Sequence, residues 1–167
     1  SVEAGIGEGS AGVLVAAGGA SVVVVRLVAG ARADRRQGRN LPIVATMLVI
    51  GAVGYLLYAT ETKEMLIAAS PLTFAAGWGW PGLFNLAVVR ANPHAPGLAS
   101  GITQTGTYIG AVAGPVLFGV LAETRSYASA WCLAAGCSLA GAAAMIAGRR
   151  LIIRHRIRTD ALAVEGI

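Results

Sequence analysis

An arginine inside a long apolar run is the residue of this sequence with the clearest potential for chemistry. Arg26 lies within the run 11–31, about 8 Å of helix before Ala31. A guanidinium at that depth costs about 2.5 kcal/mol or more if it faces lipid, so it needs a cavity or a partner. It can bind the anionic group of a solute, or pair with a carboxylate from outside this chain. Alternatively, its side chain snorkels along its own helix toward the cytoplasmic headgroups.

A second group of candidates lies in the middle of another apolar run, 65–89. Trp78, Trp80 and Pro81 stand there between glycines, away from the membrane interfaces where tryptophan normally concentrates. Pro81 lacks an N–H and predicts a kink, and broken helices of this kind line solute cavities in membranes. Asn85, one turn further, is a candidate for hydrogen bonding in such a cavity. The alternatives are two bulky packing residues beside a kink, and an amide that bonds to another helix.

The run 98–122 carries glycines on one face and polar side chains on roughly the opposite face. The glycines recur every four residues and form a smooth surface suited to close helix packing. The residues of this glycine stripe, with the proline that follows, are Gly106, Gly110, Gly114 and Pro115. Gln104 and Tyr108 form the polar pair. If the stripe packs on a neighbouring helix, the pair faces a cavity; if the stripe lines the cavity, the pair must bond to protein or meet lipid.

The residue types needed for metal binding or covalent catalysis do not cluster in the sequence. The histidines are His94 and His155, and both cysteines, Cys132 and Cys137, fall inside one apolar run. None of the acidic residues lies deep within an apolar run, so the sequence supplies no proton relay. We therefore expect no catalytic residue, no metal site and no cofactor, and a protein that is not an enzyme.

The composition of the chain is that of a protein dissolved in a bilayer. Apolar residues make up 56% and charged residues only 13% of the 167 residues, and apart from Arg26 the charges lie outside the apolar runs. Runs of about 20 residues cross the ~30 Å hydrocarbon layer as helices. We predict an all-α polytopic membrane bundle of five transmembrane helices in residues 1–148, closed by Gly148 and followed by a basic tail at 149–167. The predicted spans are 11–31, 41–59, 65–89, 98–122 and 127–147.

The positions of Lys and Arg predict which end of the bundle faces the cytoplasm. Alternate connections and the tail carry most of them: Arg32, Arg35, Arg36, Arg39, Arg90, Arg149, Arg150, Arg154, Arg156 and Arg158. The opposite side has only Lys63 and Arg125, with several acidic residues. We expect a multi-pass protein of the bacterial cytoplasmic membrane with its C-terminus in the cytoplasm. The tail should adhere to anionic headgroups. Because the cations lie at span ends and not on one face, we expect no nucleic-acid partner.

The connection after the first span carries a motif. From Gly30 to Arg39 the chain reads GARADRRQGR, which resembles the G-x-x-x-D-R-x-G-R loop of the major facilitator superfamily. One extra residue separates Arg35 from Gly38, which favours the weaker second copy of the loop, between spans eight and nine. The resemblance implies a conformational gating loop, in which a glycine turn and charges that include Asp34 lock one arrangement of the bundle. The alternative is a basic membrane anchor with an incidental Asp34.

The fourth span carries a second resemblance. From Gly101 to Gly119 it reads G-x8-G-x3-G-P-x2-F-G, which is similar to the glycine-proline signature of the superfamily's antiporters, with Phe118 in place of a glycine. The third span lacks the intramembrane arginine motif of the family's first half, since Arg90 lies at its cytoplasmic end. The resemblance therefore implies spans eight to twelve, and we expect the chain to be a C-terminal fragment.

The resemblance also implies a function. A member of this family is a secondary active transporter, which moves a small organic solute by alternating access without making or breaking bonds. The expected partners are that solute, the lipid bilayer and the missing N-terminal half of the same transporter. The alternative is a membrane-embedded structural or regulatory subunit without transport activity of its own, a role that the glycine stripe would also serve.

Overall fold

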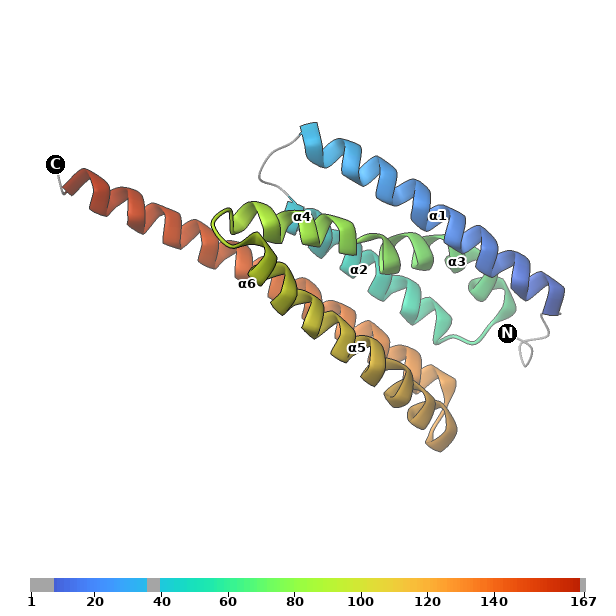
Figure 1. Ribbon diagram of the computed structural model, residues 1–167. Coiled ribbons are helices and arrows are strands. Elements are labelled where there is room, and N and C mark those ends of the chain that lie inside the picture. Colours follow the sequence, from blue (N-terminus) through green and yellow to red (C-terminus); the bar gives the residue numbers. More distant parts are fainter. Residues whose placement is uncertain (1–7, 36–39, 166–167) are drawn as a thin grey trace.

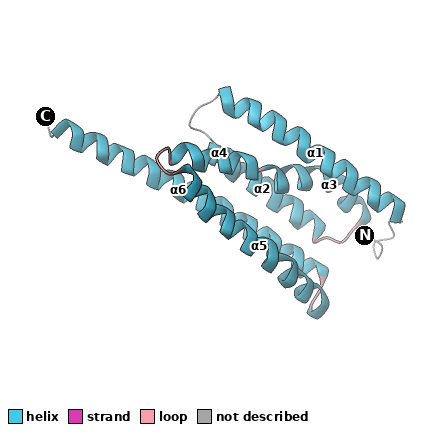
Figure 2. Ribbon diagram, in the orientation of Figure 1, coloured by secondary structure: helices cyan, strands magenta, loops and turns pink. Residues whose placement is uncertain are grey.

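The computed structural model describes residues 8–35 and 40–165, and the regular structure of these two segments is entirely helical (Figure 2). The helices of the described segments are α1 Glu8–Arg35, α2 Asn40–Tyr58, α3 Lys63–Gly79, α4 Pro81–Ala91, α5 Pro96–Thr124 and α6 Tyr127–Glu165. The predicted all-α fold is confirmed.

Five spans of the described chain are long and apolar enough to cross a membrane, as predicted. The helices α3 and α4 together form one of them, Lys63–Ala91, and a single helix forms each of the others. Even α2, with 19 residues, is about 28 Å long. That length matches the hydrocarbon layer of a bilayer.

Successive spans run in opposite directions (Figure 1). In the bundle α3 packs between α1 and α2, α2 packs against α6, and α5 packs against α6 at the edge. The beginning of α1 and the end of α6 consequently lie at opposite ends of the molecule (Figure 1). The end of α1, the end of α4 and the C-terminal part of α6 share one end, and the α2–α3 and α5–α6 connections share the other.

Small residues allow α2 and α3 to approach closely. A Cβ atom on Gly51 would lie 3.1 Å from the Cα atom of Gly77, and one on Gly54 would clash with the side chain of Thr73. The Thr73 hydroxyl donates to the carbonyl of Ala69, so its polar atom is satisfied within α3. Close packing of backbones is what holds helices together where the surroundings are as apolar as the helices.

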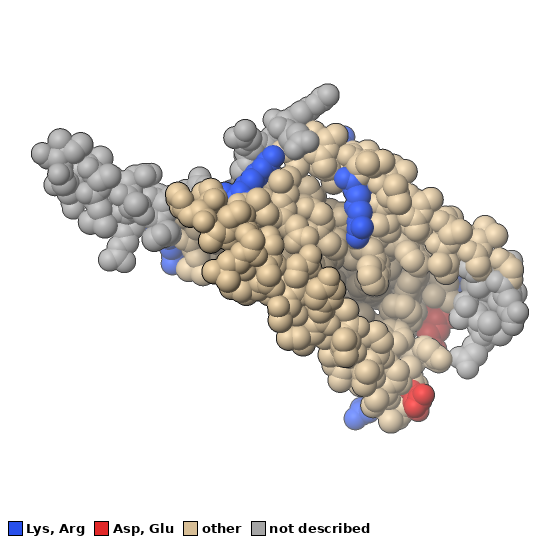
Figure 3. All heavy atoms as spheres, in the orientation of Figure 1, with Lys and Arg blue, Asp and Glu red and all other residues tan. Residues whose placement is uncertain are grey.

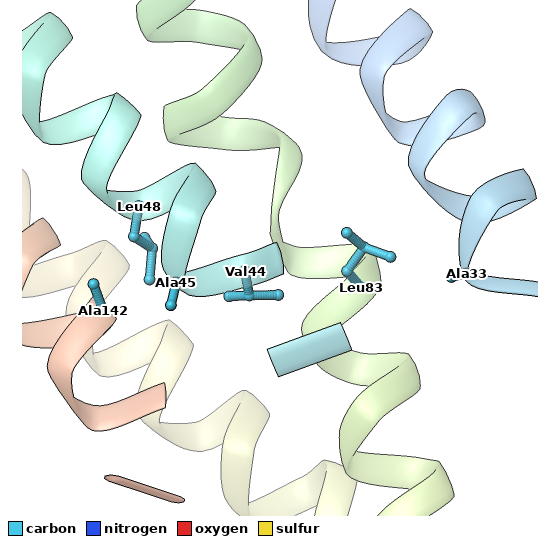
Figure 4. Close-up of a cluster of buried hydrophobic side chains, with 6 residues drawn as sticks. All are labelled: Ala33, Val44, Ala45, Leu48, Leu83 and Ala142. Atoms are coloured by element: carbon cyan, nitrogen blue, oxygen red, sulfur yellow. The ribbon is translucent and has the colours of Figure 1, made fainter. Parts of the chain in front are cut away.

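The largest buried cluster is also built mainly from small residues, and four of the helices meet there. Its members are Ala33 of α1, Val44, Ala45 and Leu48 of α2, Leu83 of α4, and Ala142 of α6 (Figure 4). Val44 is fully buried at the centre of this contact. The cluster fixes α1 and α4 relative to the α2–α6 pair.

Trp131 of α6 anchors the other side of the bundle. Its ring packs edge to face against Tyr58 and Phe118, at centroid distances of 4.9 and 4.8 Å, and stacks on Tyr55 at 6.0 Å. These rings come from α2, α5 and α6, so one aromatic cluster joins three helices. Aromatic pairs in such geometries contribute about 0.5–1.5 kcal/mol beyond their buried area.

The N-terminus of α6 is capped twice. The Ser126 hydroxyl accepts from the backbone N–H of Ser129, and the Ser129 hydroxyl accepts from the N–H of Ser126, which is the reciprocal arrangement of a capping box. The carboxylate of Glu61, from the α2–α3 connection, accepts the N–H of Ala128 at 2.7 Å. Glu61 has φ 57°, a left-handed conformation unusual for a residue other than glycine. The two connections at this end are therefore tied together.

The expected end of the last helix is wrong. Gly148 does not close the last helix, because α6 continues to Glu165 and reaches beyond the rest of the bundle (Figure 1). A glycine inside a helix costs only about 1 kcal/mol, and no proline follows it to end the helix.

Gly30, Asp34 and Arg35 lie in the last turns of α1. The alanines between them favour helix. Gly38, the other glycine of the motif, lies outside the described residues, so the expected glycine turn stays a prediction.

Candidate functional site

The third span is interrupted at its centre, as Pro81 predicts. Because Pro81 has no N–H, it cannot donate to the carbonyl of Gly77, four residues earlier. The indole Nε1 of Trp80 donates to that carbonyl instead, at 2.9 Å. The Trp80 ring also packs edge to face on Phe84, with 5.8 Å between centroids. A side chain thus satisfies the polar atom that the proline leaves open, and it holds the break between α3 and α4 in place.

Arg26 of α1 reaches this break. Its Nη2 donates to the carbonyl of Trp78 at 2.9 Å. Trp78 lies about 20 Å along the span from Ala91 and about 22 Å from Lys63, and therefore near the middle of the membrane. The side chain does not extend along its own helix to the C-terminal end of α1, because it bonds to the Trp78 carbonyl. Its cation is held at mid-depth between α1 and the broken span.

The cation at the break faces no carboxylate of the described side chains. The acidic residues among them are Glu61, Glu64 and Glu123, and each belongs to a connection or a helix end at the far end of the bundle. In Figure 3 the acidic side chains lie at the end that holds the α2–α3 and α5–α6 connections, where one basic side chain is also visible, and the other visible basic side chains lie away from that end. Arg26 is exposed on the surface of the chain. Its positive charge is therefore open to a group that approaches from outside.

The other candidates for the cavity lie on two different spans. Trp78 is 61% exposed, whereas Trp80 is half-buried, and both belong with Arg26 to the break. Asn85 is half-buried on α4, one turn past it. Gln104 is half-buried and Tyr108 is exposed, and both belong to α5, which packs on α6 and α4. A hydrogen bond joins Arg26 to Trp78, whereas the Trp80 indole bonds to Gly77. Among the described residues no bond runs from the α5 pair to Arg26.

The glycine stripe of α5 packs on no helix of the described chain. A Cβ atom built on Gly106, Gly110 or Gly114 would meet nothing within 4 Å, and α5 has no buried residue although Pro115 lies within it. The residues beside the stripe, from Tyr108 to Leu117, line an open apolar groove. The described part of the chain leaves this surface of α5 uncovered. Close helix packing through the glycine stripe therefore stays a prediction.

Glycines that do make helix contacts were not singled out from the sequence. Gly51 and Gly54 meet α3, and a Cβ atom on Gly18 of α1 would overlap the ring of Phe74. Their signal was the Gly-x-x-Gly spacing in the second span. That pattern is shorter than the four-residue repeat of α5 and is less noticeable in a chain with 23 glycines.

The end of the bundle that holds the motif is only partly described. The guanidinium of Arg90, at the end of α4, donates to the carbonyl of Ala33 in the last turns of α1 at 3.2 Å. A cation at a helix C-terminus is favourable, since the terminal carbonyls carry partial negative charge. The side chains of Asp34 and Arg35 and the whole of Gly38 and Arg39 lie outside the described residues, so the gating role stays a prediction.

The fold describes a multi-pass membrane protein, and among the described spans the break holds an arginine at mid-depth. The chain matches the family model of the Major Facilitator Superfamily over residues 1–161, and it belongs to that family. It is therefore a membrane transporter of this superfamily, whose members are not enzymes. No curated protein and no solved structure gives a significant match.

Proposed function

We propose that the chain is part of a secondary active transporter that moves a small organic solute by alternating access. The observation that carries this proposal is the cation of Arg26 held at mid-depth on the α3–α4 break. Transporters of this architecture bind their solutes near the bilayer midplane, beside interrupted helices. The break supplies such a place, and Trp78, Trp80 and Asn85 surround it on the same span.

Open helix faces support a second half of the transporter. The helix α5 has no buried residue, and its exposed apolar side chains include Ile102, Val112 and Val116. A helix that is apolar all round needs lipid or other helices on every side. We propose that an N-terminal half, bringing about seven further spans, covers the faces of α1 and α5 and closes the cavity. The present spans are then numbers eight to twelve.

The orientation proposed for this chain follows from its charges. Arg32, Arg90, Arg149 and Arg150 belong to the end of the bundle where α6 leaves it, and Lys63 and Arg125 to the other. Positive residues near span ends are retained in the cytoplasm. We therefore place the C-terminal part of α6 inside the cell, in the bacterial cytoplasmic membrane, with its basic residues against anionic lipid.

A structural or regulatory subunit is the second candidate. The uncovered glycine stripe favours it, because small residues repeated every four positions suit docking on a helix of another protein. This role requires no solute site, so the Arg26 variants described next would leave it unaffected.

Solute counterflow in proteoliposomes tests the proposal. The chain is reconstituted with whatever coding sequence lies upstream, and uptake of a panel of labelled organic solutes is compared between wild type, Arg26→Ala and Arg125→Gln. We expect uptake of one solute class, its loss in Arg26→Ala and its retention in Arg125→Gln, which removes an exposed arginine far from the break. Absence of counterflow for every solute, with intact assembly, would support the subunit role instead.

A further inference from the structure

The guanidinium of Arg26 has one edge in use and one edge open. Nη2 donates to the Trp78 carbonyl at 2.9 Å, and no other described group bonds to this side chain. A guanidinium carries five N–H donors in a planar fork, and Nη2 belongs to both of its bidentate edges, one shared with Nε and one shared with Nη1. With one Nη2 hydrogen on the Trp78 carbonyl, the edge that carries the other Nη2 hydrogen keeps two parallel donors. Two parallel donors on one edge match the two oxygens of a carboxylate. The bond to Trp78 also fixes the plane of the fork, which lowers the entropy lost on binding.

The residues next to Arg26 along α1 and at the break are mostly apolar or aromatic. Trp78, whose carbonyl holds the guanidinium, exposes 61% of its surface, and Val23 and Leu27 beside Arg26 on α1 are 57% and 70% exposed. A charge is strongly attracted by an opposite charge in such a medium, because little water screens it. A cationic solute would instead face an unpaired positive charge, and a polar neutral solute would find few hydrogen-bond partners here.

The single positive charge at the site limits the charge of the anion that it can bind. Arg26 is the one cation at mid-depth among the described residues, since the other described basic side chains lie in connections or toward span ends. One guanidinium can neutralise one negative charge, whereas a dianionic phosphate or phosphonate would bring a second charge into the membrane without a partner. The site therefore fits a monoanion.

We propose that the transported solute is an organic monocarboxylate, with its carboxylate on the open edge of Arg26 and its apolar part against the ring of Trp78. This inference rests on the proposed transport function and names the solute class of that site. The Trp78 carbonyl positions the cation, and the broken span supplies the apolar surface. Binding of the carboxylate adds charge-assisted bonds without requiring the bond to Trp78 to break.

Binding is measured by calorimetry with the full chain in lipid nanodiscs and four matched probes. Benzoate is the carboxylate, phenylphosphonate is the dianion, benzamide is the neutral analogue and benzamidine is the cation. We expect benzoate to bind more tightly than the other three, and Arg26→Gln to weaken it about tenfold or more. Trp78→Ala should weaken it several-fold through lost apolar contact, and Arg125→Gln should leave it unchanged.

Two further variants separate recognition from folding. Arg26→Lys keeps the charge but loses the planar fork, so benzoate should bind with an affinity between wild type and Arg26→Gln. Circular dichroism and gel filtration establish that each variant is assembled. Equal binding of benzamide and benzoate, or unchanged benzoate affinity in an assembled Arg26→Gln protein, would overturn the inference. Tighter binding of phenylphosphonate would overturn the assignment to a carboxylate.

Counterflow measurements test the transport function separately from solute binding. Counterflow of a neutral or cationic solute that Arg26→Gln leaves unchanged would reject the monocarboxylate while the transporter function stands. Conversely, Arg26-dependent benzoate binding in a protein that catalyses no counterflow of any carboxylate would support the site and reject the proposed function.

Discussion

The bond between the Trp80 indole and the Gly77 carbonyl makes a quantitative prediction about the broken span. The bond exists because Pro81 cannot donate to that carbonyl, and the indole does so at 2.9 Å. Trp80→Phe keeps an aromatic ring beside Phe84 but leaves the carbonyl without its donor. An unsatisfied carbonyl costs about 1–3 kcal/mol when buried, and measured hydrogen bonds within membrane helices reach about 1.7 kcal/mol. We therefore expect a loss of about 1–2 kcal/mol in the free energy of unfolding.

A second variant, Pro81→Ala, completes a double-mutant cycle by restoring the missing backbone donor. Pro81→Ala supplies an N–H at the position that normally bonds to the Gly77 carbonyl, so the helix continues without the indole. In that background Trp80→Phe should cost less than about 0.5 kcal/mol, which gives a coupling of about 1 kcal/mol between the two positions. Unfolding by increasing fractions of dodecyl sulfate in mixed micelles, followed by far-ultraviolet circular dichroism, measures each step.

A matched control comes from the other side of the bundle. Trp131→Phe disturbs the aromatic cluster with Tyr58 and Phe118. Tyr55 of this cluster lies against Gly77, but the Trp131 indole makes no hydrogen bond to the Gly77 carbonyl among the described contacts. Its cost should be the same with and without Pro81→Ala. If Trp80→Phe also cost the same in both backgrounds, the indole would not be acting as a substitute for the proline's missing donor.

Three further expectations use the same unfolding measurement. Gly54→Leu should destabilise by about 1–3 kcal/mol, because its side chain would enter the space of Thr73; retained stability would show that α2 and α3 separate easily. Gly110→Leu should instead stabilise by up to about 1 kcal/mol, since leucine favours helix and nothing lies within 4 Å of its Cβ position; a loss would show that a helix covers the stripe. Glu61→Ala should cost about 0.5–2 kcal/mol through the lost cap on Ala128, and Glu61→Gln, which keeps an acceptor oxygen, should cost less.

The spans could be predicted from the sequence because their length and apolarity are properties of single segments. The interruption at Pro81 was predictable for the same reason, since a proline acts on its own helix. Helix ends were less predictable. Gly148 carries no local signal strong enough to end α6, and the motif residues from Gly30 to Arg35 continue α1, because a motif defines chemistry and does not by itself define a turn.

The candidate site was harder to predict, because it depends on which helices pack together. Residue spacing within one helix does not determine that. The glycine stripe centred on Gly110 has the more regular spacing, yet Gly51 and Gly54 make the contacts, because α3 lies against α2 and no helix of the described chain lies against the stripe. Arg26 illustrates the same limit. The sequence did not decide whether Arg26 lines a cavity or snorkels along its own helix, because the answer depends on the position of α3. The carbonyl of Trp78 lies 2.9 Å away and about 20 Å of helix before the end of α4, so the cation has a partner at mid-depth. The bond to Trp78 therefore partly offsets the cost of removing the Arg26 guanidinium from water, and the proposed carboxylate would bind its open edge.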